Sequence, residues 1–254
     1  MNDSKSYIYG RNAVAEAISS ESPIEKIYVH FGATGNAIEK VIYLARKAKI
    51  PVVKYDKQKF GELEKKITSE PMKTQGIIAL KTLVRYYDID EIVKLSFKRD
   101  SNPVLVLLNE INDVHNLGAI ARSAECSGAS GLIIPERNSS PVTPAAVKTS
   151  AGALEHIPIA KTGSVINTLV KLKEKGFWII STDMDGKNNY YDERYDKPVV
   201  IVIGNEGKGI SSAILKHSDI TIKIPMKGKI NSLNASVSAG IILFEILKQR
   251  SIKK

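Results

Sequence analysis

Residues suited to chemistry gather in three segments of the chain. The first segment runs from Asn112 to Arg122, the second from Gly204 to Gly209, and the third from Pro225 to Asn234. Each segment follows an apolar run of the kind that forms a buried strand. Ligands of open α/β sheets bind beyond the carboxyl ends of the strands. The three segments are therefore predicted to form one shared site.

The glycines of the second segment invite a nucleotide-binding interpretation. Gly204, Gly207 and Gly209 lack side chains, so a ligand could approach their backbone, and the N-terminus of a following helix attracts anions. Their spacing is G-x-x-G-x-G, which differs from the G-x-G-x-x-G of dinucleotide-binding folds and lacks the G-K-[S/T] of a P-loop. A dinucleotide-dependent dehydrogenase is therefore a poor fit.

Other catalytic classes lack their sequence signals. The chain has no G-x-S-x-G nucleophile elbow and no H-E-x-x-H motif, and its four histidines are scattered without ligand spacing. The single cysteine, Cys126, cannot form an internal disulfide or a cysteine-based zinc site, and one thiol suits a reducing compartment. The first residues lack the apolar core of a secretory signal, and no apolar run approaches the roughly 20 residues that cross a bilayer. We expect a cytoplasmic protein without a metal site.

The polar residues of the three segments also have purely structural interpretations. Asn116 and Asn234 stand directly before predicted helices and could be N-caps. Glu206 could be a first-turn acid favoured by the helix dipole, and Arg122 could be an exposed helix charge. Taken singly, each residue is better explained structurally. Together, with Ser232 and the glycines on the same sheet edge, they favour a site.

The elements that position these residues form two units. Residues 1–82 read as a small α/β unit, with strands at 24–29, 50–53 and 76–80 and a helix at 37–48. The pattern weakens over 83–102, which we take as a linker. Residues 103–254 alternate helices with continuous apolar runs, which predicts a parallel sheet buried on both faces. Its strands are expected at 104–108, 132–134, 177–180, 199–203 and 220–224, and its helices at 117–127, 145–151, 165–175, 212–215 and 234–250.

The net charge suggests a polyanionic partner. The chain holds 37 Lys and Arg against 27 Asp and Glu, a formal charge of +10. Both units are basic, so the excess does not come from a charged tail. A polyanion that contacts the whole folded body is one interpretation, and an ordinary solvated basic surface is the other.

The three segments resemble the motifs of the SpoU/TrmH family of SPOUT RNA 2′-O-ribose methyltransferases. Residues 115–124, 202–209 and 224–238 resemble the first, second and third motif of that family, in order. Residues 9–17 and 75–77 resemble the substrate-binding domain of the branch that modifies a guanosine of 23S rRNA. Departures are modest: Val114 stands where many members have proline, Ser123 where threonine is common and Ala235 where valine is common, and none of them removes a polar group that the chemistry needs.

This resemblance implies a fold, a cofactor and site residues. The fold is a C-terminal SPOUT domain with a parallel sheet and a deep trefoil knot, plus an N-terminal α/β substrate-binding domain similar to ribosomal protein L30e. The cofactor is S-adenosylmethionine, and the assembly is a homodimer. The implied catalytic or near-catalytic positions are Arg122, Asn116, Glu206, Ser232 and Asn234. The implied cofactor contacts are Gly204, Ile224, Leu233 and Met226.

The role of Arg122 is open to chemical argument. The family account makes it the base, yet a guanidinium stays protonated in nearly all settings. We expect Arg122 to stabilise the developing alkoxide or to grip a neighbouring phosphate. Asn116 and Asn234 would orient Arg122 or the ribose, and Glu206 would order the cofactor loop.

Two further expectations concern assembly and substrate. The final helix carries Val237, Ile241 and Phe244 on one face and Ile242 and Ile246 on another. This is broader than the single stripe of a surface helix and predicts a homodimer, with a deep core helix as the alternative. The leading reaction is 2′-O-methylation of a guanosine in 23S rRNA. The alternatives are a tRNA 2′-O-methyltransferase and a non-catalytic RNA-binding protein that retains the fold.

Overall fold

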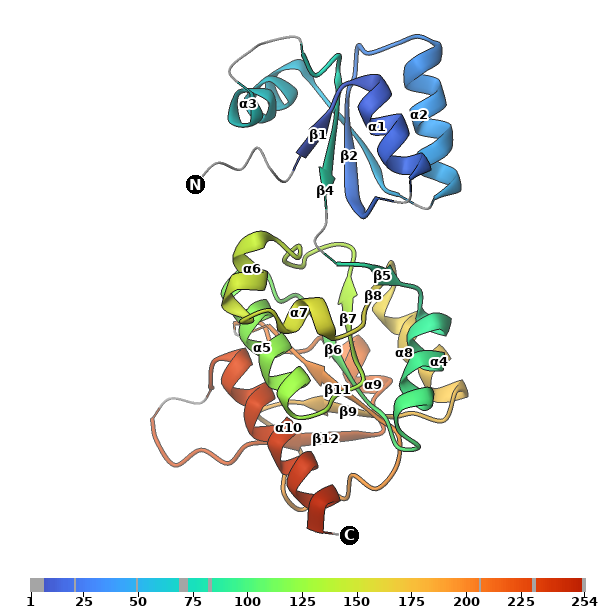
Figure 1. Cartoon of the computed structure of the whole chain (residues 1–254). Helices are drawn as coiled ribbons and strands as arrows, with labels where there is room; N and C mark the ends of the chain where they lie inside the picture. Colours follow the sequence, from blue (N-terminus) through green and yellow to red (C-terminus); the bar gives the residue numbers. More distant parts are fainter. Residues whose placement is uncertain are drawn as a thin grey trace. The chain divides into compact units, whose positions relative to one another are not determined.

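The computed structural model describes residues 7–20, 22–48, 50–68, 73–81, 84–205, 207–229 and 232–252. The chain divides into two compact units, Met1–Leu83 and Val84–Lys254 (Figure 1). Each unit has its own sheet and its own apolar core. The two units are therefore described separately.

The N-terminal unit is a four-stranded sheet covered by helices on both faces. Its elements are β1 (Tyr7–Tyr9), α1 (Arg11–Ser19), β2 (Ile24–His30), α2 (Asn36–Lys47), β3 (Val52–Tyr55), α3 (Lys57–Ile67) and β4 (Ile77–Lys81). The strand order is β1-β4-β2-β3, with β4 antiparallel to both β1 and β2 and with β3 parallel to β2. Residues of α1 and α2, such as Val14 and Val41, pack on one face, and Phe60 of α3 packs on the other.

The C-terminal unit is built on an eight-stranded sheet in which every pairing is parallel. Its strands are β5 (Tyr86–Tyr87), β6 (Val104–Leu108), β7 (Gly131–Pro135), β8 (Ile159–Thr162), β9 (Trp178–Thr182), β10 (Asn188–Asn189), β11 (Val199–Ile203) and β12 (Ile220–Lys223). Their order is β10-β12-β9-β11-β6-β7-β8-β5. Every residue of β6, β7 and β11 is buried. The predicted parallel sheet with both faces covered is confirmed.

Two helical layers cover this sheet (Figure 1). The unit's helices are α4 (Ile89–Arg99), α5 (Val114–Cys126), α6 (Pro144–Thr149), α7 (Ala153–His156), α8 (Val165–Glu174), α9 (Ser212–Lys216) and α10 (Ala235–Ile252). Alternate β6 residues face opposite ways: Val106 joins the core beneath α5 and α10, whereas Leu107 joins the core beneath α4, α8 and α9. This alternation explains why the strand reads as one apolar run.

The segment interpreted as a linker belongs largely to the C-terminal unit. The structure places β5 and α4 within residues 83–102, and Ile92 of α4 is fully buried. Asp88 and Glu91 form a capping box that starts α4: Asp88 Oδ1 accepts from the Glu91 backbone N–H, and Glu91 Oε2 accepts from the Asp88 N–H. The weak apolar pattern of this segment reflects a helix that buries only one narrow face.

Helix α5 begins earlier than its apolar pattern indicated. The predicted start was residue 117, with Asn116 as a candidate N-cap. The observed N-cap is Asp113, whose Oδ1 accepts from the His115 N–H at 2.9 Å. Asn116 therefore lies inside the first turn, and its interpretation as a cap is wrong. The trefoil knot and the likeness to L30e stay predictions, because strand order by itself does not determine the threading.

Candidate functional site

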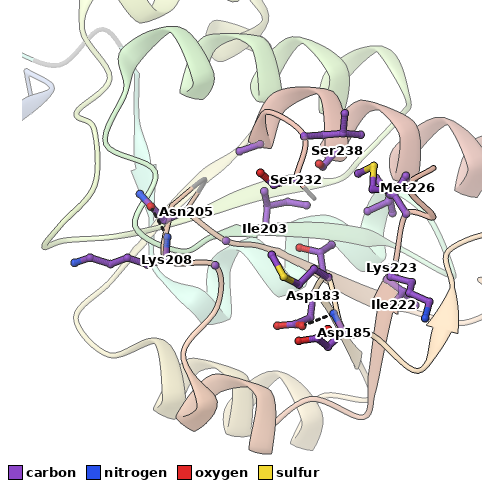
Figure 2. Close-up of a pocket in the computed structure, with 18 of the residues that line it drawn as sticks. Asp183, Asp185, Ile203, Asn205, Lys208, Ile222, Lys223, Met226, Ser232 and Ser238 are labelled. Carbon is purple, nitrogen blue, oxygen red and sulfur yellow. Dashed lines mark hydrogen bonds between the residues drawn. The ribbon is translucent and has the colours of Figure 1, made fainter. Parts of the chain in front are cut away.

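A pocket of about 640 Å³ lies at the carboxyl edge of the C-terminal sheet (Figure 2). Its walls come from the second and third segments, from the first turns of α10, and from the end of β9. Two of the three segments that the sequence assigned to one site therefore meet in one pocket. All four predicted cofactor residues line it, namely Gly204, Ile224, Met226 and Leu233, and so does Ser232.

The second segment forms a tight loop ordered by Asn205. The Asn205 Oδ1 accepts from the backbone N–H groups of Gly207 at 2.9 Å and Lys208 at 3.1 Å. Its Nδ2 donates to the carbonyl oxygen of Glu110 at 2.9 Å, which ties the loop to the segment after β6. Gly209 has φ 65°, in the left-handed region that favours glycine. Sequence reasoning emphasised Glu206, which lies outside the described residues, and missed Asn205.

The end of β9 supplies a wall that sequence reasoning also missed. Thr182, Asp183, Met184 and Asp185 line the pocket (Figure 2). The Asp183 Oδ1 accepts from the Asp185 N–H at 2.8 Å, which holds the turn in place. Gly186 closes the turn against β12, because a Cβ there would lie 2.6 Å from the Ile222 carbonyl carbon. The signal was present: these polar residues directly follow a buried strand.

Charged side chains of both signs line this pocket, namely Asp183, Asp185, Lys208 and Lys223. Figure 2 shows Asp183 and Asp185 on one side and Ser232 and Ser238 on the other. The lysine Lys208 also contributes to the wall, from the second segment. The site thus combines carboxylates that can accept hydrogen bonds from ammonium or hydroxyl groups with apolar side chains and open backbone.

Asn234 joins the first segment to the start of α10. Its Oδ1 accepts from the N–H groups of Ser236 at 2.9 Å and Val237 at 3.4 Å, so Asn234 is the cap of α10 that the structural interpretation expected. Its Nδ2 donates to the Oδ1 of Asn116 at 2.9 Å, across 118 residues of chain. Asn116 is only 8% exposed. One asparagine therefore both caps α10 and fixes the first turn of α5.

Arg122 lies on α5 and does not line the pocket. Its side chain is exposed. Within the part of the chain that the structure describes, its guanidinium has no hydrogen-bond or ion-pair partner. Gly118 lies one turn before Arg122 on the same side of α5, and His115 lies two turns before it. Gly118 packs closely on Thr149 of α6, and the His115 Nδ1 lies 3.3 Å from the Thr149 Oγ1. The structure thus brings Asn116 and Asn234 together and leaves Arg122 free at the surface of the same helix.

Comparisons with known proteins show the family of the chain. Residues 103–244 match the SpoU rRNA methylase family, and residues 7–87 match the family described as RNA 2′-O ribose methyltransferase substrate binding. The chain is 34% identical over 251 residues to YacO of Bacillus subtilis, which is assigned to the TrmH family of tRNA/rRNA methyltransferases; the match covers 99% of this chain and 98% of YacO. A protein of Staphylococcus haemolyticus with the same family assignment is 37% identical over 243 residues, covering 96% of this chain and 95% of its own.

A solved structure supports the fold of both units. The SpoU methyltransferase AviRb of Streptomyces viridochromogenes, in complex with S-adenosylmethionine, has a TM-score of 0.61 at 22% identity. The match covers 97% of this chain and 90% of AviRb. The predicted α/β fold with a parallel sheet and a smaller N-terminal domain is confirmed. Among the described residues, no helix has the length and apolar character needed to cross a membrane.

Proposed function

Because the chain belongs to the SpoU/TrmH family of RNA 2′-O-ribose methyltransferases, we propose that it methylates the 2′-hydroxyl of a guanosine in 23S rRNA with S-adenosylmethionine as donor. The observation that carries the methyl transfer is the pocket in which all four predicted cofactor residues meet, and the choice of a guanosine in 23S rRNA rests on the resemblance of residues 9–17 and 75–77. A tRNA substrate is the second candidate, because the relatives are assigned to a family of tRNA/rRNA methyltransferases.

The lining of the pocket fits this cofactor. The side chains of Ile224, Met226 and Leu233 offer apolar contact for an adenine ring, and the ring can approach the backbone of the second segment because Gly204, Gly207 and Gly209 carry no side chains. Asp183 and Asp185 offer carboxylates to the hydroxyl and ammonium groups of the same molecule. When bound, S-adenosylmethionine supplies an electrophilic methyl group on a sulfonium.

The protein must position the ribose and assist loss of its proton. A hydroxyl that attacks a methyl group in line gains most of its rate from orientation. The Asn116–Asn234 hydrogen bond fixes the first turn of α5 against the start of α10, beside the pocket-lining Ser232 and Leu233. We assign these two asparagines to positioning. Ser232 lines the pocket and is assigned to contact the ribose.

Arg122 is assigned to the RNA side of the reaction. Its five N–H donors are free within the described residues, so they are available to a phosphate and to the developing alkoxide. A guanidinium stays protonated, which makes it suited to stabilise negative charge and unsuited to remove a proton. The role of Glu206 in ordering the cofactor loop stays a prediction.

The proposed assembly is a homodimer that uses the outer face of α10. Val237 is 47% exposed and Phe244 is 48% exposed, whereas Ile242 and Ile246 on the other face are buried. Of the two apolar faces of α10 expected from the sequence, one is therefore buried in the unit and the other is exposed to solvent. Light scattering should give a dimer for the wild type and a monomer for Phe244→Glu. A wild-type monomer at micromolar concentration would contradict the assembly.

Single-turnover methylation tests the function. The assay uses full-length protein, radiolabelled S-adenosylmethionine and unmodified 23S rRNA. Arg122→Ala should abolish transfer while titration calorimetry finds cofactor binding nearly unchanged, because Arg122 lies outside the pocket. Arg122→Lys should also fail, because lysine lacks the planar fork that holds two groups at once. Arg99→Ala, which removes another exposed arginine from the unit, is the matched control and should keep wild-type activity. If Arg122→Ala methylated RNA at the wild-type rate, Arg122 would be an exposed helix charge without a catalytic role.

A further inference from the structure

Phe31 is the most exposed large apolar side chain among the described residues, at 74%. It directly follows β2, and its backbone N–H donates to the carbonyl oxygen of Tyr55 at the end of β3, at 2.8 Å. The ring is therefore held on rigid backbone at the end of the sheet. Phe31 belongs to neither apolar core of the N-terminal unit. Packing within the described part of that unit does not account for an exposed phenylalanine at this position.

Four loops lie at the sheet edge that carries Phe31. Strands β1 and β2 are both antiparallel to β4, and β3 is parallel to β2, so β1, β2 and β3 end at the same edge where β4 begins. The loop before β4 is tied to the start of α1, because the Arg11 N–H donates to the Gln75 Oε1 at 3.1 Å and the Arg11 Nε donates to the Gln75 carbonyl at 3.2 Å. It is also tied to β2, because the His30 N–H donates to the Gly76 carbonyl at 2.9 Å.

Cations outnumber carboxylates among the described residues at this edge. The Lys54 Nζ lies 5.8 Å from the centroid of the Phe31 ring, Arg11 is the first residue of α1, and Lys73 stands in the loop before β4. Two carboxylates also lie here, and both accept hydrogen bonds within the unit: Asp56 from the Lys59 N–H as the N-cap of α3, and Glu64 from the Thr74 hydroxyl. A surface that binds an apolar protein partner would carry further apolar side chains around Phe31. The residues present instead pair one open aromatic face with cations.

We propose that this edge of the N-terminal unit binds an unpaired nucleotide of the RNA substrate, with the base stacked on Phe31 and the adjoining phosphates near Lys54 and Arg11. Unpaired bases stack on exposed aromatic rings, and lysine and arginine hold the backbone beside them. Duplex RNA buries its base faces except at its two ends, so it offers far fewer faces for stacking than an unpaired strand does. The proposal deepens the proposed function by giving RNA a second contact point, and it rests on RNA as the substrate.

Fluorescence anisotropy with labelled single-stranded oligo(U) tests the proposal on full-length protein. Phe31→Ala should weaken binding about tenfold, within the range that alanine substitution of stacking residues produces. Tyr43→Ala is the matched control, because Tyr43 is 66% exposed on α2 of the same unit, and its affinity should equal that of the wild type. Phe31→Trp should retain affinity, and its added fluorescence should be quenched by oligo(U). The chain has one other tryptophan, so wild-type protein gives the baseline.

Two arms decide between the outcomes. If Phe31→Ala binds oligo(U) as tightly as Tyr43→Ala does, the proposal is overturned. If a blunt RNA duplex loses as much affinity as oligo(U) on Phe31→Ala, the contact is not base stacking, and the proposal is also overturned. The catalytic function is tested separately. If the wild type methylates RNA and Phe31→Ala binds oligo(U) as tightly as the wild type does, only the proposed binding surface is ruled out. If Phe31→Ala loses affinity for oligo(U) but the wild type does not methylate RNA, only the proposed enzymatic activity is ruled out.

Discussion

Replacing Gly204 by alanine should disable the cofactor pocket through a clash inside the second segment. A Cβ at this position would lie 2.7 Å from the carbonyl carbon of Gly209, 2.7 Å from the Ile210 Cγ1 and 2.8 Å from the Gly209 oxygen. Two of the three atoms belong to backbone, so a rotamer change cannot relieve the contact. The loop must therefore move until these distances exceed 3.0 Å, the floor for real Cβ contacts.

The size of the effect follows from this forced displacement. Overpacking a well-packed site costs about 1–3 kcal/mol. Because Gly204 and Gly209 both line the pocket, we expect much of that cost to fall on cofactor binding. Each 1.4 kcal/mol is a factor of about ten in the dissociation constant. Titration calorimetry should find S-adenosylmethionine bound about tenfold more weakly by Gly204→Ala.

The same loop offers a matched control. Among the described residues beyond its chain neighbours, a Cβ on Gly207 would meet only the Asn205 Oδ1, at 3.6 Å, which is ordinary van der Waals contact. Gly207→Ala should therefore bind the cofactor within about twofold of the wild type, since a change without strain falls within about 0.5 kcal/mol. The reasoning is refuted if Gly204→Ala binds normally, or if Gly207→Ala loses as much affinity as Gly204→Ala.

Three further predictions concern stability. A double-mutant cycle of Asn116→Ala and Asn234→Ala, read by urea unfolding, should give a coupling energy of about 1 kcal/mol for their hydrogen bond, and simple additivity would contradict the contact. Arg250 is a half-buried guanidinium that donates to the carbonyls of Tyr195, Lys197 and Asn102, so Arg250→Gln should lower the free energy of unfolding by about 1.5–3 kcal/mol, and an unchanged urea midpoint would exclude this clamp. Burial raises the pKa of Tyr28 from 10.0 to about 12, so the folded protein holds this proton more tightly than the unfolded chain does. The stability that Tyr28 contributes should be complete below pH 10 and lost as pH rises toward 12; Tyr28→Phe should flatten that part of the profile, and an unaltered slope would refute the cause.

The sequence predicted well those strands in which every residue is buried. β6 and β11 are five-residue apolar runs, and both are buried along their whole length because helices cover both faces of the sheet. β8 was missed because it has only four residues and carries Lys161. Helix α3 was missed because it buries little beyond Phe60 and Ile67, which gives too few apolar positions for a period to emerge.

The site divides in the same way into local and long-range features. Polar residues that follow apolar strands located the second and third segments, and the same rule applied to β9 would have found Asp183 and Asp185. The order within the site depends instead on contacts between distant residues. Asn205 donates to Glu110 across 95 residues, and no local pattern in a single sequence encodes such a pair. The resemblance placed Arg122 at the ribose and phosphate rather than at the cofactor pocket, and in the structure Arg122 does not line that pocket.

Mass-spectrometric mapping of ribose methylation tests the central claim most directly. Ribosomal RNA and tRNA would be isolated from cells that contain the protein, from cells that lack it, and from cells that carry only Arg122→Ala. The account predicts one 2′-O-methylguanosine in 23S rRNA that is present in the first sample and absent from the other two. A lost methyl group in tRNA instead would select the second candidate substrate. Identical ribose methylation in all three samples would contradict the assignment as an RNA methyltransferase acting in these cells.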